Sequence, residues 1–333
     1  MKKILITGAS GSGGSYLSEY ILQHRKKYFV YGIYRNKKKL SSINCFFLKK
    51  NKRFKYVYCD LSKQNQIEKT LNQIKPDYIF HLASNADVNK SFYTPKKIIL
   101  DNNLCTLNLL EAMRLTNCKA KIQICSTSEV YGNVPRKLQP ISEEVSIKPA
   151  NPYAISKVFQ DYLSQVYYKV YKLNVVITRM FTYLNARRTN LFASSFAHQL
   201  IKMKYKKKPK ALLHGNLKSK RVILDIRDAM NAYLLSMEKG KVGVIYNIGG
   251  GHVATIGQVL DELIKNFDFD VKKIRSSKLL RPSDIDIQLP DSKKFKKTTG
   301  WKIKYNFKEG IKYLLKESEI VFFYNSKKKN KRK

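Results

Sequence analysis

A tyrosine and a lysine in the middle of the chain have the types and the spacing that proton transfer requires. Tyr153 and Lys157 are four residues apart, so in a helix they lie on one face. An ammonium group there can lower the pKa of the phenol, which then acts as a general acid or base near neutral pH. The same spacing recurs at Tyr34, Tyr93, Tyr168 and Tyr324. Only its position after a hydroxyl-rich strand therefore distinguishes Tyr153.

A hydroxyl and a carboxylate end the strand that precedes this helix. The segment 126–132 reads Ser-Thr-Ser-Glu-Val-Tyr-Gly, so Thr127 and Glu129 are two positions apart. If the strand stays extended, both side chains project to the same side. The sequence therefore predicts that Thr127 and Glu129 face the same reacting group as Tyr153 and Lys157.

A glycine-rich loop opens the chain between an apolar strand and the first helix. It contains Gly8, Gly11 and Gly14, followed by Ser15. Such glycines permit a tight turn, let backbone N–H groups approach a pyrophosphate, and let the helix pack closely with its positive end toward the phosphates. Because the loop has this strand-to-helix context, it predicts a dinucleotide site that includes all four residues; a plain glycine-serine loop is the alternative.

The end of the second strand indicates which dinucleotide is bound. An acid there would accept the ribose hydroxyls of NAD, whereas this chain has Arg35 followed by a lysine-rich run, which suits the 2′-phosphate of NADP. NADP is therefore the predicted cofactor, and the alternative is that Arg35 is one more surface cation. The residues expected to bracket the adenine and to line the cofactor channel follow the third and fourth strands: Asp60, Leu61, Leu82, Ala83 and Ser84.

These residues require a scaffold of alternating strands and helices. Strand patterns occur at 3–7, 29–34, 54–59, 78–82, 121–125 and 174–179, and helical patterns at 15–24, 63–74, 97–115 and 153–171. The alternation predicts an α/β fold, a Rossmann-type doubly wound parallel sheet covered on both faces. Beyond about residue 182 the pattern loosens, with helices near 194–204, 227–238 and 256–266.

The chain is therefore expected to divide into three parts. Residues 1–180 form the NADP-binding domain that carries the catalytic residues. Residues 181–320 form a smaller C-terminal α/β region that mainly binds substrate, with a strand and a helix returning to the sheet. Residues 321–333 form a basic disordered tail, because the lysine-rich run 327–333 has nothing to bury, and deleting that run should leave turnover unchanged.

Composition narrows the functional classes. The 333 residues include 65 Lys plus Arg against 24 Asp plus Glu, and the net charge of +41 would attract any polyanion. The cations are spread along the chain without a nucleic-acid-binding motif, so no specific nucleic acid is expected; a polyanion-binding non-enzyme is a remote alternative. Five scattered cysteines and five histidines without ligand spacing predict reduced thiols and no metal. No apolar run is long enough for a membrane helix, and a cytoplasmic location is expected.

Together these motifs resemble the extended short-chain dehydrogenase/reductase family, and within it the GDP-mannose 4,6-dehydratases and the GDP-4-keto-6-deoxymannose reductases. The likeness covers nearly the whole chain. Further matching segments are His81-Leu82-Ala83, Asn151-Pro152-Tyr153-Ala154, Ala186-Arg187-Arg188, Gly215-Asn216, Lys220-Arg221 and Leu280-Arg281-Pro282-Ser283. Because the matches occur in the family's order, they form a specific signal.

The resemblance implies a nucleotide-sugar 4,6-dehydratase that forms a 4-keto-6-deoxy sugar nucleotide by internal hydride transfer through bound NADP. Tyr153 would remove the proton from O4 of the hexose while Thr127 hydrogen-bonds that oxygen. Glu129 would remove the C5 proton, and Lys157 would hold the nicotinamide ribose. The substrate-binding residues implied are Arg187, Asn216, Arg221 and Arg281. A nucleotide-diphosphate sugar, most simply a GDP-hexose, is the implied partner, and a homodimer or homotetramer is expected.

Departures from the dehydratase pattern leave the base and the hexose open. Residues 182–184 read Thr-Tyr-Leu where the family usually has Asn-His-Glu, and Val222 replaces an acid. The alternatives on the same scaffold are a 4-keto sugar-nucleotide reductase, an epimerase or a UDP-glucuronate decarboxylase. All of them share Tyr153 and Lys157, so those two residues do not separate the reactions.

Overall fold

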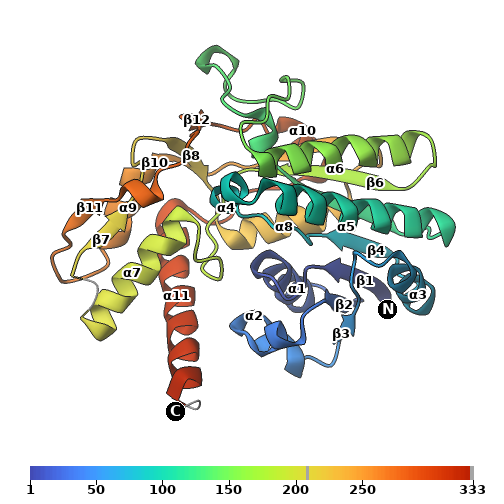
Figure 1. The fold of residues 1–333 in the computed structure, drawn as a ribbon, viewed down its shortest axis with the longest axis horizontal. Coiled ribbons are helices and arrows are strands. Elements are labelled where there is room, and N and C mark those ends of the chain that lie inside the picture. Colours follow the sequence, from blue (N-terminus) through green and yellow to red (C-terminus); the bar gives the residue numbers. More distant parts are fainter. Residues whose placement is uncertain (208–209, 331–333) are drawn as a thin grey trace.

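Seven parallel strands form the central sheet of the protein, whose structure, a computed structural model, describes residues 1–207 and 210–330 (Figure 1). The strands are β1 (Lys2–Thr7), β2 (Tyr28–Tyr34), β3 (Phe54–Tyr58), β4 (Tyr78–His81), β5 (Lys121–Thr127), β6 (Val175–Met180) and β9 (Ile245–Ile248). Their order across the sheet is β3-β2-β1-β4-β5-β6-β9, and every neighbouring pair is parallel. The predicted Rossmann-type fold is confirmed.

The buried strands follow from largely apolar sequence, although β6 also buries Arg179, which pairs with Asp161 at 2.9 Å. β6 is buried along its whole length, and β1 is buried from Ile4 to Thr7. Parallel strands covered on both faces are expected to read as such runs rather than as alternating patterns. β9 has only four residues and lies in the part of the chain where the alternation of strands and helices is lost, so its sequence gave no clear signal.

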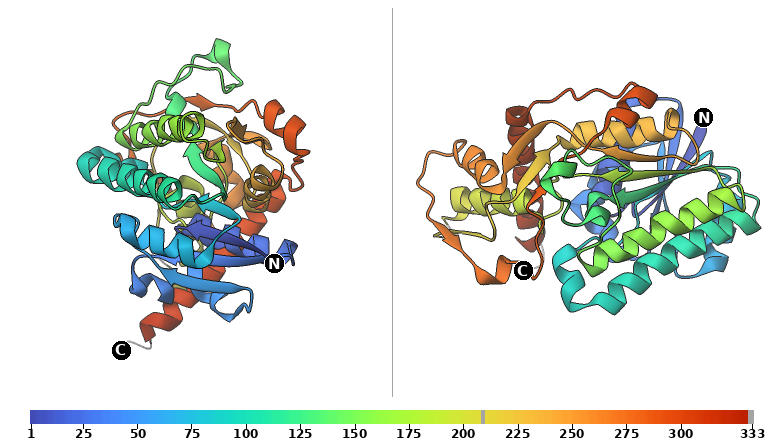
Figure 2. Two further views of the ribbon diagram at one scale, coloured as in Figure 1. Left: turned by 90° about the vertical axis from the view of Figure 1, so that its right-hand side faces the viewer. Right: turned by 90° about the horizontal axis from the view of Figure 1, so that it is seen from above.

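Helices cover both faces of the sheet (Figures 1 and 2). On one face lie α1 (Ser12–His24), α8 (Ile226–Glu238) and α10 (Lys293–Thr299), and on the other lie α3 (Gln64–Ile74), α5 (Pro95–Leu115) and α6 (Pro152–Lys169). Leu17 and Met230 belong to the apolar core on the first face, and Leu71 and Leu109 to the core on the second. The short helix α4 (Val88–Tyr93) packs against α5 and α6.

The smaller region lies beyond the carboxyl ends of the strands (Figure 1). Its helices are α7 (Phe192–Lys206), α9 (Ile256–Ile264) and α11 (Phe307–Asn330), which share an apolar core with Leu200, Leu260 and Ile311 at its centre. Its strands are β8 (Lys220–Ile223), β10 (His252–Thr255) and β12 (Ile287–Gln288) in one sheet, and β7 (Leu212–His214) and β11 (Lys273–Arg275) in another. Between these elements the chain returns to the large sheet as α8 and β9.

The prediction of a disordered tail over 321–333 is wrong for residues 321–330, which continue helix α11. Val321 is buried, and the ring of Phe322 stacks on Tyr205. The Tyr324 hydroxyl donates to the backbone oxygen of Ser41, in the loop after β2, at 3.0 Å. The apolar residues just before the lysine run therefore dock the helix end, and residues 331–333 lie outside the described residues. Neither α11 nor any other helix in the described ranges is long and apolar enough to cross a membrane.

Candidate active site

A cavity of about 850 Å³ lies where the carboxyl ends of the strands meet the smaller region. Open α/β sheets bind ligands in this position because loops from several neighbouring strands converge there. The cavity brings together most of the residues predicted from the sequence: Gly8, Gly11, Gly14, Arg35, Asp60, Leu61, Leu82, Ala83, Ser84, Thr127, Glu129, Tyr153, Lys157, Asn216, Arg221 and Arg281. Ser15 and Arg187 do not line it.

The glycine loop forms a cradle that side chains would fill. Gly8 has a φ of +71°, and a Cβ there would lie 2.9 Å from the backbone nitrogen of Ala83. A Cβ on Gly14 would lie 2.4 Å from the oxygen of Gly8, because the first turn of α1 packs directly on the loop. Gly11 precedes α1, whose free N–H groups give this end of the cavity a positive potential. The arrangement fits the pyrophosphate of a dinucleotide.

Ser15 lies behind the cradle rather than in it. This position corrects the prediction that Ser15 contacts the cofactor. The side chain is fully buried, and its hydroxyl donates to the oxygen of Ser12 at 3.0 Å. The Ser15 hydroxyl also accepts a hydrogen bond from Arg187 at 3.1 Å. Ser15 follows Gly14 on the buried face of α1, so its side chain points toward the smaller region.

Thr127 and Glu129 reach the cavity by a turn and not by an extended strand. β5 ends at Thr127, and Glu129 belongs to the 3₁₀ turn η3 (Ser128–Tyr131). The Thr127 hydroxyl accepts from the backbone N–H of Glu129 at 3.3 Å, which caps the turn. The premise of an extended strand is therefore wrong, although both side chains line the cavity.

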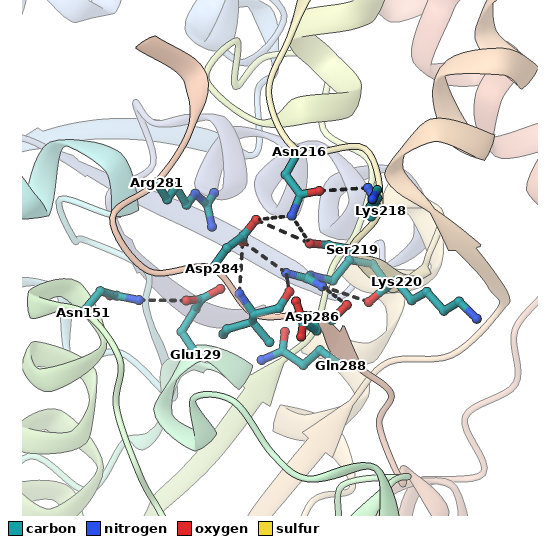
Figure 3. Close-up of polar contacts among 12 residues, drawn as sticks. Glu129, Asn151, Asn216, Lys218, Ser219, Lys220, Arg281, Asp284, Asp286 and Gln288 are labelled. Atoms are coloured by element: carbon teal, nitrogen blue, oxygen red, sulfur yellow. Dashed lines mark hydrogen bonds and ion pairs between the residues drawn. The ribbon is translucent and has the colours of Figure 1, made fainter. Parts of the chain in front are cut away.

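Asn151 fixes the Glu129 carboxylate relative to the helix that carries Tyr153 (Figure 3). Its side-chain nitrogen donates to Oε2 of Glu129 at 2.9 Å. Its side-chain oxygen accepts from the N–H of Ala154 at 2.8 Å and so caps α6. One amide therefore couples the position of the carboxylate to the start of α6.

Lys157 is held in place by groups other than Tyr153. Its ammonium donates to the oxygen of Cys125 at 2.7 Å and to Oε1 of Gln160 at 2.9 Å, and it lies 6.0 Å from the centre of the Tyr153 ring. Gln160 in turn donates to the oxygen of Asn102 at 2.9 Å. Burial lowers the pKa of Lys157, because the charged form loses hydration.

The cation that most favours an ionised Tyr153 is Arg188. Burial raises the pKa of the Tyr153 phenol, and the positive charge of Arg188 opposes this more than any other group does. A hydrogen bond with Thr127 acts in the same direction as Arg188. The sequence pattern predicts this effect for Lys157, whose ammonium lies 6.0 Å from the centre of the Tyr153 ring and is held by Cys125 and Gln160. Tyr153 thus sits among several groups that adjust its protonation.

Arg187 and Arg188 are adjacent, but their side chains take different directions. Arg187 is buried in the protein, and Arg188 lines the cavity. The Arg187 side chain is only 2% exposed; it pairs with Glu19 at 2.7 and 2.8 Å, and with Glu317 at 3.4 Å. Its guanidinium carbon lies 4.0 Å from the centre of the Tyr16 ring. The predicted role of Arg187 in substrate binding is therefore corrected to a structural one. Arg188 lines the cavity and donates to the oxygen of Ala86.

We expect Arg187→Met to lower the free energy of unfolding by about 3 to 5 kcal/mol, because it leaves Glu19 and Glu317 without their buried counter-ion. Arg188→Met should cost less than about 1 kcal/mol, since it removes no buried pair. Urea denaturation of both variants measures the difference. Equal losses in the two variants would contradict the separate roles assigned to these neighbours.

The smaller region contributes a second group of polar side chains (Figure 3). Arg221 is almost fully buried and donates to the oxygens of Ile285 at 2.7 Å and Lys220 at 2.8 Å. Asn216 donates to Oδ2 of Asp284 at 2.8 Å, and Arg281 donates to the side chain of Asn89 in α4. Burial lowers the pKa of Arg221, and among nearby acids the charge of Glu129 opposes this most. Arg221, on β8 of the smaller region, therefore lines the same cavity as the Glu129 carboxylate.

Several residues of the site had no clear signal in the sequence. Tyr233, in α8, lines the cavity with its hydroxyl 2.9 Å from Sγ of Cys125, although the two are far apart in the chain. Asp284 and Gln288 also line the cavity. Asn151 occurs above only within a segment that resembles the family, although its role as an N-cap could have been predicted, because an Asn before a Pro at the start of a helix is typical of that position.

Comparison with known proteins places this geometry in a family. A family model described as GDP-mannose 4,6 dehydratase matches residues 5–314. A GDP-6-deoxy-D-mannose reductase of Pseudomonas aeruginosa is 27% identical, over 73% of this chain and 81% of its own length. A GDP-mannose 4,6 dehydratase of Drosophila melanogaster is 25% identical, over 95% of this chain and 85% of its own.

A solved structure has the same fold. The UDP-glucuronic acid 4-epimerase of Bacillus cereus, in complex with UDP-glucuronic acid and NAD, superposes with a TM-score of 0.84 at 26% identity. The superposition covers 96% of this chain and 99% of that one. Since the family model extends over almost all of the sequence and the fold agrees, the chain belongs to the GDP-mannose 4,6 dehydratase family.

Proposed function

We propose that the protein is an NADP-dependent nucleotide-sugar 4,6-dehydratase whose best substrate is GDP-mannose. The observation that carries the proposal is the carboxylate of Glu129, which lines the same cavity as Tyr153 and Lys157 and is held by Asn151. A simple hydride transfer needs only the phenol and its supports. A dehydratase also needs a base at C5, and Glu129 supplies one.

The residues around the cradle fit a nicotinamide dinucleotide. The N–H groups at the start of α1 would hold the pyrophosphate, and Arg35 with Lys39 would hold the 2′-phosphate. Asp60 would lie at the adenosine end, and Lys157 would hold the nicotinamide ribose. When bound, the nicotinamide supplies the acceptor and later the donor of hydride, and its oxidised form adds a positive charge that favours the phenolate.

Tyr153 and Thr127 act on the hexose at O4. As C4 is oxidised, the phenolate of Tyr153 accepts the O4 proton, and the Thr127 hydroxyl stays hydrogen-bonded to that oxygen. Burial opposes formation of the phenolate, whereas Arg188 and Thr127 favour it. A base whose pKa is adjusted by its surroundings in this way can both take and return the proton within one catalytic cycle.

Glu129 acts after the ketone has formed. A carbonyl at C4 makes the neighbouring C5 proton acidic, and the carboxylate removes it while the C6 hydroxyl leaves as water. The proton taken from C5 leaves with the C6 hydroxyl as water, and transfer of hydride to C6 and of the proton held by Tyr153 to C5 completes the product. Because Asn151 occupies one carboxylate oxygen at 2.9 Å, the other oxygen is the one available to the substrate.

The diphosphate would lie between the two halves of the site. Arg221 and Arg281 both line the cavity, and a forked guanidinium suits two phosphate oxygens. Backbone oxygens hold two of the Arg221 nitrogens, so this arginine is preorganised and pays little entropy on binding. Asn216 and Asp284 lie beside them and would contact the nucleoside.

A 4-keto sugar-nucleotide reductase is the second candidate, because the Pseudomonas aeruginosa relative is named a GDP-6-deoxy-D-mannose reductase. The two reactions differ in their cofactor balance. A reductase consumes one NADPH for each product, whereas a dehydratase returns its hydride to the same molecule. Following the near-ultraviolet absorbance of NADPH during turnover separates them.

Product mass tests the proposed function. The protein is incubated with GDP, UDP, CDP and dTDP hexoses, and each product is weighed by mass spectrometry. We expect GDP-mannose to yield a product lighter by one water. Loss of carbon dioxide from a uronate would indicate a decarboxylase, and an unchanged mass with altered stereochemistry would indicate an epimerase.

We expect NADP(H) to bind at least about tenfold more tightly than NAD(H), equivalent to ~1.4 kcal/mol, because Arg35 follows β2 where an acid would favour NAD. Arg35→Ala should remove most of this preference, and Lys38→Ala, an exposed cation on the same loop, should not. Calorimetry with both cofactors gives the ratios. Equal affinities in the parent protein would refute the argument from Arg35.

We also propose that the protein forms a homodimer through α5 and α6. The outer face of α6 exposes a helical stripe of Ile155, Phe159, Tyr162 and Val166, and α5 exposes Leu100 and Leu104. A contiguous apolar stripe of this kind is typical of an interface. The five cysteines are all unpaired, and we propose for the protein a reducing compartment such as the cytoplasm. Sedimentation at micromolar concentration should give twice the chain mass, and a monomer would exclude this dimer.

A further inference from the structure

The turn that carries Glu129 is tied to the substrate-binding sheet by one buried amide. Gln288, in β12, accepts from the hydroxyl of Ser128 at 2.9 Å and donates back to the oxygen of Ser128 at 3.0 Å. Ser128 and Gln288 are 4% and 2% exposed. Ser128 lies between Thr127 and Glu129, so this reciprocal pair acts at the centre of the turn.

The same strand organises the arginine that faces the diphosphate. Gln288 lies opposite Arg221 in the parallel pairing of β12 with β8, and Arg221 donates to the oxygen of Ile285 just before β12. Gln288 itself lines the cavity, together with Glu129 and Asp284 (Figure 3). One short strand therefore connects the position of Arg221 with the position of the base.

We propose that Gln288 is a positioning residue that fixes the Glu129 turn to the substrate-binding sheet, so that binding of the diphosphate and placement of the base at C5 are mechanically coupled. The proposal rests on the dehydratase function and deepens it. Asn151, the N-cap of α6, holds the Glu129 side chain, and Gln288 in β12 holds the preceding residue, Ser128, so the carboxylate is located between the two parts of the protein.

The chemistry gives a specific expectation. Tyr153 stands on α6 and does not depend on Gln288, so oxidation at C4 should proceed when Gln288 is changed. Removal of the C5 proton depends on the place of Glu129, and a displacement near 1 Å can cost about 10²-fold in rate. A residue with only a general structural role would slow both steps alike.

The test compares Gln288→Leu with Gln123→Leu. Gln123 is equally buried, and its amide donates to Thr178. Both of these residues belong to the seven-stranded sheet, and Gln123 does not contact the turn. We expect Gln288→Leu to slow exchange of the C5 proton with deuterated water by about tenfold or more. The rate of nicotinamide reduction in a single turnover should change less than about threefold, and Gln123→Leu should spare the ratio of the two rates.

Hydrogen exchange of the backbone provides a readout that needs no turnover. Amides in the segment 128–132 should exchange at least about tenfold faster in Gln288→Leu than in the parent, and those of α6 should not. Ser128→Ala, which keeps the bond to the backbone oxygen, guards against a misfolded variant and should give an intermediate effect. The double variant should be no slower than Gln288→Leu alone.

Equal slowing of both steps, a ratio no different from that of Gln123→Leu, or unchanged exchange in 128–132 would overturn the proposal. Failure of the proposed function looks different, because the parent protein itself would then release no water from any sugar nucleotide. In that case the hydrogen exchange of backbone amides in Gln288→Leu still shows whether β12 holds the turn that carries Glu129.

Discussion

Glu129→Gln is expected to separate the two halves of the reaction. The bound NADP should still be reduced by substrate, because Tyr153 and Lys157 are unchanged, while release of water falls by about 10² to 10⁴, the contribution of a positioned general base. The amide keeps the size of the carboxylate and cannot accept the C5 proton. Rapid mixing gives the first rate from nicotinamide absorbance, and quenched samples give the second from product mass.

The control for this variant is Glu144→Gln. Glu144 is also an acid in a loop between β5 and α6, but its side chain is 85% exposed and does not line the cavity. It should behave as the parent in both steps. If Glu129→Gln dehydrates at the parent rate, then Glu129 is not the base, and a reductase or epimerase becomes the better description.

Tyr153→Phe is expected to stop both halves, because the O4 proton must leave before C4 can become a ketone. Loss of the phenol removes the first base of the sequence, and every later step depends on that ketone. We expect nicotinamide reduction and water release to fall together by about 10² to 10⁴. Single-turnover absorbance and product mass, measured on the same samples, provide the comparison.

Tyr168→Phe is the matched control, since Tyr168 also has a lysine four residues on and lies in the same helix. It does not line the cavity, so both rates should be unaffected. A Tyr153→Phe variant that reduces the nicotinamide at the parent rate would remove the phenol from the mechanism.

The sequence was sufficient for the dinucleotide cradle because its geometry depends on the absence of side chains. Gly8 and Gly14 are places where a Cβ would collide with backbone, and no other residue type could occupy them without a shift. Early strands such as β1 were equally readable, because a strand buried on both faces must be continuously apolar. Constraints imposed within a few residues are visible in a linear pattern.

Choices made by tertiary packing were not visible. Arg187 and Arg188 are identical side chains, and the one that turns inward is decided by Glu19 and Glu317, which come from α1 and α11. Strand β5 bends into a turn at Thr127 because that hydroxyl caps the N–H of Glu129, two residues on. Neither the partners of Arg187 nor the capping by Thr127 can be deduced from the spacing of residues in the sequence.

The C-terminal segment shows how composition can mislead. The lysine run at 327–333 indicated disorder, but several residues just before it are apolar, and Val321 is buried within α11. Tyr324 then bonds Ser41 across the molecule. A charged face on a docked helix and a disordered tail have the same lysine content, and only the spacing of their apolar residues differs.

In the proposed reaction, one bound cofactor passes hydride within a single sugar while water is lost. The most direct measurement is turnover of GDP-mannose by the protein with a catalytic amount of NADP, followed at once by product mass and nicotinamide absorbance. We predict many products per cofactor, each lighter by one water, with no net change in absorbance. Stoichiometric consumption of NADPH, or turnover of sugar nucleotides without loss of water, would contradict it.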